Sequence, residues 1–396
     1  MGKNKMTTHV FIVNDQTFKY HLEYLFAGTG VGNRDNKGVK KNYKYVDFNN
    51  SSHSTLYSNK KHATEAGLVS MMADCCRMRI GDNVLFYLQA TSQQEGRFFG
   101  IFKVEGNPFL DRDGRYLEND LGKNLTFRIK IKPSEVYSKG VTEWQALDEI
   151  RNIPCPCQML WSLIYRKLKG NRGNTMITIY ESERLIDLIR RENNNQQINI
   201  QNNQRFSYDA HSNSITLINT NYTYQGTMET INILPRLIEK YNNNKAHEAH
   251  LQMYIAQHLG LGTNASLDNA LGIRGQNIEW IGNEVSCGVG MQRIDLMFSS
   301  IVSETQRLLC PIELKAVPAY SGITNQISRY IDWIEQYYIP NRISTIQPIL
   351  ICKKGNVLSQ EFHQFNLKIH PNGILPLKYI EYEVNNNNIV FNTVSY

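Results

Sequence analysis

The sequence has no apolar run that approaches the roughly 18 residues of a membrane-spanning helix. Its start, MGKNKMTTHV, lacks the apolar stretch of a signal peptide, so we expect a cytoplasmic protein with no membrane partner. No two CxxC pairs stand at the spacing of a zinc site. The seven cysteines are therefore expected to be free thiols in a reducing compartment.

Neither sign of charge dominates, since the net charge is +7 over 396 residues. The charge is unevenly distributed: residues 1–192 carry 29 Lys and Arg against 21 Asp and Glu, a net of +8, whereas residues 193–396 carry 14 against 15. This excess suits contact with a polyanion, although lysine-rich loops are as often only solvated surface. The length exceeds that of one typical core and favours two domains.

One segment consists almost entirely of Asn and Gln. It is NNNQQINIQNNQ, residues 193–204, with ten Asn or Gln in twelve positions and no apolar periodicity. We therefore expect a first domain over residues 1–192, an Asn/Gln-rich linker region over 193–222 and a second domain over 223–396. The first domain contains short β-rich runs (HVFIVN, NVLFYLQ, RFFGIFKV, LTFRIKI) and two helical patterns (MLWSLIYRKL, ESERLIDLIRR), which predict a small β-barrel with helices. In the second domain, helical and strand patterns alternate, which predicts an α/β fold.

Charged residues interrupt one apolar run of the second domain, CPIELKAV, residues 310–317. Strand alternation places Glu313 and Lys315 on one face and Ile312 and Leu314 on the other. The plainest interpretation is an edge strand with one solvated face. The rest of the domain favours a functional interpretation instead.

Other polar residues are expected to approach the same point. Asp295 alternates with apolar neighbours in RIDLMF, and Glu248 shares a helical stripe with Leu251, which puts a carboxylate on a buried face. Gln326 and Tyr330 are four residues apart, so they share one face of a helix.

Several carboxylates beside one lysine repel each other unless a cation joins them. Mg²⁺ takes oxygen ligands and needs only one or two protein carboxylates together with a substrate phosphate. Such an ion orients and acidifies a water for attack on phosphorus. A lysine in the site helps to position or deprotonate that water.

The order Glu, Asp, ExK, QxxxY resembles the PD-(D/E)XK nuclease superfamily, and RIDLMF, PIELKA and QISRYIDW resemble its NucS-type branch over roughly residues 245–355. The resemblance implies an α/β nuclease fold and DNA cleavage with Mg²⁺, for which Mn²⁺ is expected to substitute. It makes Asp295 and Glu313 the metal ligands and Lys315 the catalytic lysine. Glu248 would be an accessory acid. The residues that steady the site and the DNA would be Gln326 and Tyr330.

The first domain carries a looser resemblance, over about residues 8–192. LYSNKKHATEAGLVSMM, the hairpin MRIGDNVLFYLQ with EGRFFGIFKVEGNPF, and MLWSLIYRKLKGNRGNT follow an order similar to that of EVE-like members of the PUA superfamily. The resemblance implies a pocket that holds one flipped, often modified, nucleobase. Core packing is the alternative role of each aromatic.

The implied substrate-binding residues include Tyr57, which stands where the family often has a pocket tryptophan. The full set is Tyr57, Ser58, Asn59, Tyr87, Gln89, Trp161 and Arg172. Arg172 ends the basic stretch RKLKGNR, which suits phosphate contacts, as does NRDNKGVKKNYK, residues 33–44.

Together these features predict a Mg²⁺-dependent restriction endonuclease on double-stranded DNA, whose first domain reads a flipped and possibly modified base. One alternative is a repair endonuclease on mismatched or branched DNA. Another is a non-catalytic nucleic-acid reader with a decayed nuclease fold. Because the chain has a single ExK motif and duplex cleavage needs two cuts, we expect a homodimer.

Overall fold

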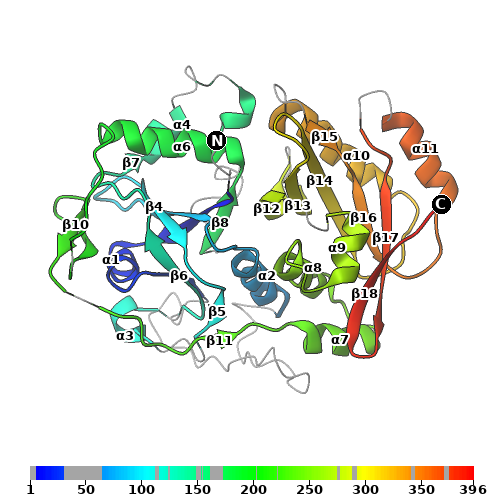
Figure 1. The fold of residues 1–396 in the computed structure, drawn as a ribbon, viewed down its shortest axis with the longest axis horizontal. Coiled ribbons are helices and arrows are strands. Elements are labelled where there is room, and N and C mark those ends of the chain that lie inside the picture. Colours follow the sequence, from blue (N-terminus) through cyan, green and yellow to red (C-terminus); the bar gives the residue numbers. More distant parts are fainter. Residues whose placement is uncertain are drawn as a thin grey trace.

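The protein, seen in a computed structural model, forms two lobes that lie side by side (Figure 1). The structure describes residues 6–30, 65–111, 116–123, 125–148, 153, 155–160, 173–201, 203–220, 222–273, 277–287, 292–339, 344–369 and 374–396. None of the helices in these ranges is long and apolar enough to cross a membrane. The architecture is mixed α/β with several sheets.

The first lobe is built on a nine-stranded sheet. Its strands are β1 (Thr8–Val13), β2 (Phe26–Thr29), β3 (Asn83–Leu88), β4 (Arg97–Val104), β5 (Phe109–Leu110), β6 (Phe127–Pro133), β7 (Val141–Thr142), β8 (Asn174–Ile177) and β11 (Glu229–Thr230). They run in the order β11-β5-β6-β4-β3-β1-β8, with β2 beside β6 and β7 beside β4. The described strands thus leave the sheet open between β11 and β8, and the closed barrel expected for this region is not formed among them.

Helices pack around this sheet. They are α1 (Asp15–Tyr24), α2 (Glu65–Cys76), α3 (Glu118–Leu121), α4 (Glu143–Asp148), the 3₁₀ turn η3 (Pro156–Gln158) and α6 (Ile179–Glu192). Capping bonds form at the starts of α1, η3 and α6. The Thr178 and Glu181 side chains each bond the other residue's backbone N–H in a capping box, which confirms the helix expected from ESERLIDLIRR. Most of the helix expected from MLWSLIYRKL lies outside the described residues.

The expected linker region contains regular structure. Within residues 193–222, β9 (Arg205–Asp209) and β10 (Ser214–Ile218) form an antiparallel hairpin. Phe206 and Tyr208 are buried with Phe18 of α1 and Phe99 of β4. Apolar side chains therefore fix this hairpin to the first lobe.

The second lobe is built on a seven-stranded sheet. Its strands are β12 (Asn277–Ser286), β13 (Arg293–Ile301), β14 (Arg307–Lys315), β15 (Ser344–Ile346), β16 (Ile349–Lys353), β17 (Lys378–Asn385) and β18 (Asn388–Thr393). Their order is β12-β13-β14-β16-β17-β18, with β15 beside β14. The helices are α7 (Leu234–Asn242), α8 (Glu248–His258), α9 (Ala265–Leu271), α10 (Thr324–Trp333), its π-helical continuation η4 (Ile334–Tyr338) and α11 (Ser359–Ile369).

Both faces of the second sheet are covered, which accounts for the apolar runs in its strands. Ile312 and Leu314 of β14 belong to the same buried cluster as Leu251 of α8. Leu309 of β14 belongs to the cluster of Ile327 in α10 on the other side. The sheet therefore lies between α8 and α10, and the ends of these helices approach the same strand.

The two lobes share one hydrophobic core. Helix α2 of the first lobe lies beside α8 of the second (Figure 1), and Leu68 and Met72 of α2 belong to the same buried cluster as Leu251 and Ile255 of α8. Ordered apolar contacts, and not only the connecting chain, therefore join the lobes.

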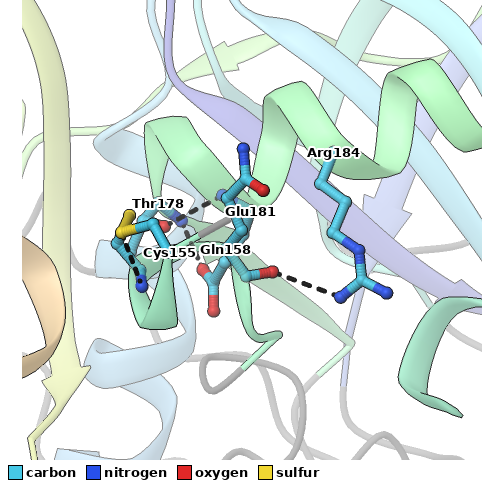
Figure 2. Close-up of a disulfide and its surroundings, with 6 residues drawn as sticks. Cys155, Gln158, Thr178, Glu181 and Arg184 are labelled. Carbon is cyan, nitrogen blue, oxygen red and sulfur yellow. Dashed lines mark hydrogen bonds between the residues drawn. A yellow bond between two sulfur atoms is a disulfide. The ribbon is translucent and has the colours of Figure 1, made fainter. Parts of the chain in front are cut away.

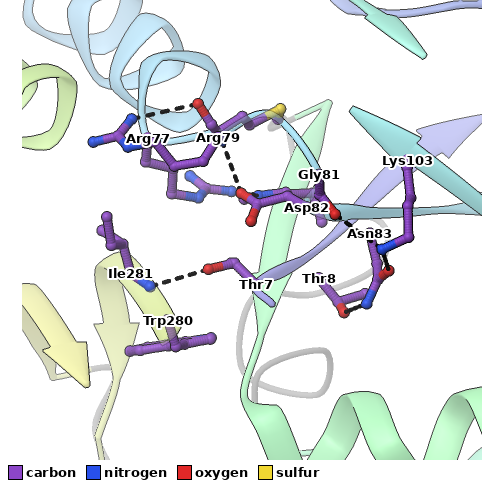
Figure 3. Close-up of polar contacts among 12 residues, drawn as sticks. Thr7, Thr8, Arg77, Arg79, Gly81, Asp82, Asn83, Lys103, Trp280 and Ile281 are labelled. Atoms are coloured by element: carbon purple, nitrogen blue, oxygen red, sulfur yellow. Dashed lines mark hydrogen bonds and ion pairs between the residues drawn. The ribbon is translucent and has the colours of Figure 1, made fainter. Parts of the chain in front are cut away.

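Buried polar contacts cross the same boundary. The hydroxyl of Thr7 accepts a hydrogen bond of 3.1 Å from the backbone N–H of Ile281 in β12 (Figure 3). Arg79, just after α2, donates to the carbonyls of Ala256 and Leu259 at the end of α8, at 2.7 and 3.3 Å. Since a buried polar group costs free energy when its partner is removed, these bonds fix how the lobes meet.

The cysteines differ in part from the expectation of free thiols. The five cysteines Cys75, Cys76, Cys287, Cys310 and Cys352 are free and buried. Cys155 and Cys157 form a disulfide beside the start of α6 (Figure 2). The expectation was wrong for this pair because close spacing of thiols leaves both states open.

Candidate active site

Asp295 and Glu313 lie on neighbouring strands near one end of the second sheet. Strands β13 and β14 are antiparallel, and the pair Leu296–Ile312 is adjacent to both acids. Cross-strand neighbours in an antiparallel pair project to the same face. The two carboxylates therefore lie together, as the sequence pattern indicated.

Strand β14 is a central strand. It pairs with β13 on one side and with β15 and β16 on the other. Glu313 is 1% exposed. The edge-strand interpretation of CPIELKAV was wrong, because alternation along a strand does not reveal which strands will flank it.

Hydrogen bonds and ion pairs connect the acids to Lys315. The backbone N–H of Leu314 donates to Asp295 Oδ2 at 2.8 Å. The ammonium group of Lys315 bonds to Glu313 Oε1 and lies 4.0 Å from Glu248 Oε2. One lysine thus faces three carboxylates from β13, β14 and α8.

The other oxygen of Glu313 is held from α10. The hydroxyl of Tyr330 is 2.7 Å from Glu313 Oε2 and 2.9 Å from the carbonyl of Arg293. Gln326 Nε2 donates to this hydroxyl at 2.6 Å, which leaves its proton for Glu313 or Arg293. The expectation that Gln326 and Tyr330 share a helix face directed at the site is met.

Glu248 is the first residue of α8, and its side chain is 47% exposed. The expectation that it lies on a buried stripe was wrong, because the apolar stripe of the helix begins after it, at Leu251. The side chain projects from the helix start toward Lys315. It is the most accessible of the three carboxylates.

Two further residues adjoin Asp295 that the sequence reasoning missed. Gln252 Nε2 donates to the carbonyl oxygen of Asp295 at 2.7 Å and to Glu284 Oε1 at 3.1 Å. Glu284, at a φ of 51° within β12, also pairs with Arg293 at 2.9 Å. The spacing of four residues from Glu248 to Gln252 was an available signal, since it puts both on one helix face.

Burial and the charges of neighbouring residues shift the pKa values of the candidate catalytic residues. Burial, together with the charge of Glu313, raises the pKa of Asp295 well above its usual range. Although Glu248 is half exposed, partial loss of contact with water raises its pKa, against the opposing charge of Lys315. Burial disfavours the Lys315 ammonium, but the Glu313 and Glu248 charges outweigh it and raise the lysine pKa. Burial and Glu313 raise the pKa of the Tyr330 hydroxyl.

The donor set fits a hard divalent cation with few protein ligands. Within the described ranges, no three or more His, Cys, Asp and Glu side chains are grouped as a set of metal ligands. Mg²⁺ is commonly coordinated by one or two protein carboxylates, while waters and a substrate phosphate complete its coordination shell. Its charge also offsets the repulsion between two neighbouring carboxylates. Asp295 and Glu313 are the two residues that fit this role.

The expected nucleobase pocket of the first lobe is only partly within the described residues. Tyr87 is fully buried, its ring packs on Phe98, and its hydroxyl donates to Glu143 Oε2 at 2.7 Å. Gln89 follows β3 and is partly exposed. The residues that lie outside the described ranges are Tyr57, Ser58, Asn59, Trp161 and Arg172. Base binding by this set stays a prediction.

A cavity of about 570 Å³ lies elsewhere, where the lobes meet. Its lining includes Arg79, Asp82, His258 and Trp280, and none of the six candidate catalytic residues. The cavity and the cluster of Asp295, Glu313, Glu248 and Lys315 are therefore separate features of the structure.

No protein-family model matches the chain. No curated protein matches it either. Among solved structures, the chain is similar to a hypothetical protein from Leishmania major, with 11% identity, a TM-score of 0.29, and coverage of 47% of this chain and 96% of that one. Human THYN1 protein in complex with 5-methylcytosine containing DNA gives 9% identity, a TM-score of 0.26, and coverage of 46% and 96%. The DUF55 domain of human thymocyte nuclear protein 1 gives 9% identity, a TM-score of 0.26, and coverage of 46% of this chain and 97% of that one. Likenesses at these TM-scores settle neither fold nor function.

Proposed function

We propose that the protein is a Mg²⁺-dependent endonuclease that cuts double-stranded DNA. Cleavage would take place at the second-lobe cluster formed by Asp295, Glu313, Glu248 and Lys315. One observation carries this proposal: Asp295 and Glu313 lie on adjacent strands with Lys315 bonded to Glu313 and Glu248 4.0 Å from that lysine. This arrangement agrees with the PD-(D/E)XK resemblance of the sequence. The fold class that goes with it is an α/β nuclease domain.

Asp295 and Glu313 would hold the Mg²⁺, and Mn²⁺ would substitute. The bound ion supplies an oriented water of lowered pKa and charge neutralisation at the phosphate. Burial and the neighbouring charge of Glu313 raise the pKa of Asp295, and a cation between the two acids would relieve their repulsion, which supports this assignment.

The chain's own groups hold and orient the site. Lys315 places a positive charge beside both Glu313 and Glu248, where it would stabilise negative charge that develops on a phosphate. Tyr330 fixes Glu313 through Oε2, and Gln326 fixes Tyr330 in turn. Glu248, half exposed, is placed to accept a proton from water.

The first lobe would examine the DNA. The excess of basic residues in 1–192 supports phosphate contacts, and the EVE-like sequence resemblance supports a pocket for a flipped, possibly modified base. Restriction of foreign DNA is the role that joins such a reader to a nuclease. Because the sequence has a single ExK motif, a homodimer would cut both strands.

The experiment is digestion of plain, cytosine-modified, adenine-modified and mismatched duplexes with Mg²⁺, by the parent and by Asp295→Ala, Glu313→Ala and Lys315→Ala. We expect the parent to cut and each variant to bind DNA without cutting. Preference for modified DNA supports restriction, and preference for mismatches supports repair. A variant that cuts at the parent rate would remove that residue from the site, and a parent that cuts no duplex would overturn the proposal.

A further inference from the structure

The contact between the lobes includes a largely buried ion-pair cluster that meets α8, the helix that also carries Glu248. Glu65, the first residue of α2, receives two parallel hydrogen bonds from Arg236 of α7, at 2.8 and 2.9 Å. Lys240 Nζ lies 3.4 Å from Glu65 Oε2, and His250 Nε2 lies 2.9 Å from Glu65 Oε1. One carboxylate of the first lobe thus holds two helices of the second.

The cluster is largely shielded from water. The side chains of Glu65, Arg236, Lys240 and His250 are 11%, 8%, 13% and 3% exposed. Low exposure strengthens charge interactions and makes the loss of one partner costly. This cluster therefore fixes the helices far more firmly than a surface ion pair would.

Helix α8, which Glu65 contacts through His250, also carries two residues of the candidate active site. On α8, Glu248 and Gln252 are four residues apart and face Lys315 and Asp295. His250 lies between them in sequence, about 200° around the helix from Glu248 by helical geometry, and faces Glu65. A rotation of α8 that frees His250 would also withdraw Glu248 and Gln252.

Contacts other than Glu65 also hold α8, among them the core shared with α2 and the bonds from Arg79 to its last turn. His247, just before the helix, bonds through Nε2 to the hydroxyl of Tyr382 in β17 at 2.7 Å. This bond belongs to the second lobe alone. Loss of Glu65 should therefore shift α8 rather than unfold it.

We propose that Glu65 is a positioning residue for the nuclease site: through His250 it sets the orientation of α8, so that cleavage depends on how the first lobe is docked. This inference rests on the proposed function. It assigns to the first lobe a role in catalysis that is separate from reading DNA.

The test compares Glu65→Gln with Glu135→Gln in the full-length protein. Glu135 is a control for the bond geometry because it accepts the same double hydrogen bond from Arg190, at 2.9 and 2.9 Å, in the first lobe away from α8. Its side chain is 29% exposed, against 11% for Glu65. We expect Glu65→Gln to lower kcat at least tenfold, with KM changed less than twofold, since small displacements of catalytic groups are that costly. Glu135→Gln should leave both values as in the parent.

Two further readouts separate positioning from simple loss of stability. Amide exchange in residues 248–258 should rise in Glu65→Gln and not in Glu135→Gln, at a temperature where both are folded. His250→Gln keeps an N–H donor for Glu65 and should retain more activity than His250→Ala. If Glu65→Gln cuts at the parent kcat, or the two His250 variants are equally active, the inference is overturned while the proposed function stands. A parent that cuts no DNA overturns both.

Discussion

His21 should make the protein lose stability as the pH falls below neutrality. It lies in α1 and is 1% exposed. Its Nδ1 bonds to the carbonyl of Thr17, and its Nε2 accepts a hydrogen bond of 3.0 Å from the backbone N–H of Gly28. The neutral ring with its proton on Nδ1 satisfies both partners. A second proton on Nε2 would point at the Gly28 N–H.

The size of the effect follows from the shift of the pKa. Burial lowers the pKa of His21 from 6.5 to about 3, with the Lys123 and Arg128 charges adding to it and the Thr17 hydrogen bond opposing it. Because the folded-state value is the lower one, this stability is fully present above pH 6.5 and is lost between pH 6.5 and about 3. The slope is about 1.4 kcal/mol per pH unit, so about 2 kcal/mol should be lost between pH 7 and pH 5.

The assay is urea unfolding of the parent and of His21→Gln at pH 7 and pH 5. Burial also lowers the pKa of the buried histidines His9, His247 and His250 and of the partly buried His258. Their contribution is common to both proteins and cancels in the difference. We expect the parent to lose about 2 kcal/mol more than His21→Gln. His363→Gln, a change at an exposed histidine, controls for the loss of a ring. Equal losses in the parent and His21→Gln, or an NMR titration of His21 near pH 6.5, would refute the reasoning.

Three other predictions concern the site and the DNA. Asp295→Asn removes one of two repelling charges, and the new amide oxygen can still accept the hydrogen bond from the Leu314 N–H. The variant should therefore have a higher melting temperature than the parent in EDTA and should not cut DNA. A lower melting temperature in scanning fluorimetry would contradict the repulsion between the two acids. Tyr330→Phe deletes the 2.7 Å bond to Glu313, and loss of a hydrogen bond to a charged group, worth about 1.5–3 kcal/mol, should lower kcat roughly 10- to 100-fold with DNA affinity retained. An unchanged kcat in steady-state kinetics would exclude that role. DNA affinity of the parent, followed by fluorescence anisotropy, should fall about 10³-fold between 50 and 200 mM salt if six or more phosphates are contacted, and salt-independent binding would argue against a basic first lobe as the binding surface.

Local patterns were sufficient to predict several individual elements. The β-rich runs HVFIVN, NVLFYLQ and RFFGIFKV match β1, β3 and β4. The capping boxes at Thr178 and Asn14 explain where α6 and α1 begin. The side of β14 that carries Glu313 and Lys315 also follows from alternation alone. These features depend on residues within one or two turns of each other.

Features that depend on distant segments were not predictable in this way. Strand β14 is central because β16, which comes later in the chain, pairs with it. The first sheet is open, and β11, which follows the Asn/Gln-rich segment in the sequence, forms one of its edges. Gln252 and Glu284 joined the site through contacts between α8, β12 and β13. Gln252 had only its four-residue spacing from Glu248 as a signal, and Glu284 had none that separates it from ordinary polar surface.

The core shared by α2 and α8 limits how this protein can be modified or can evolve. An independently folding reader can be exchanged for another by changing only the connecting segment. Here a replacement first lobe would also need apolar side chains that match Leu251 and Ile255, and a carboxylate that meets Arg236 and His250. The two halves are therefore expected to be inherited together, and grafting either half onto a foreign partner should give insoluble protein unless the surface of α2 or α8 is redesigned.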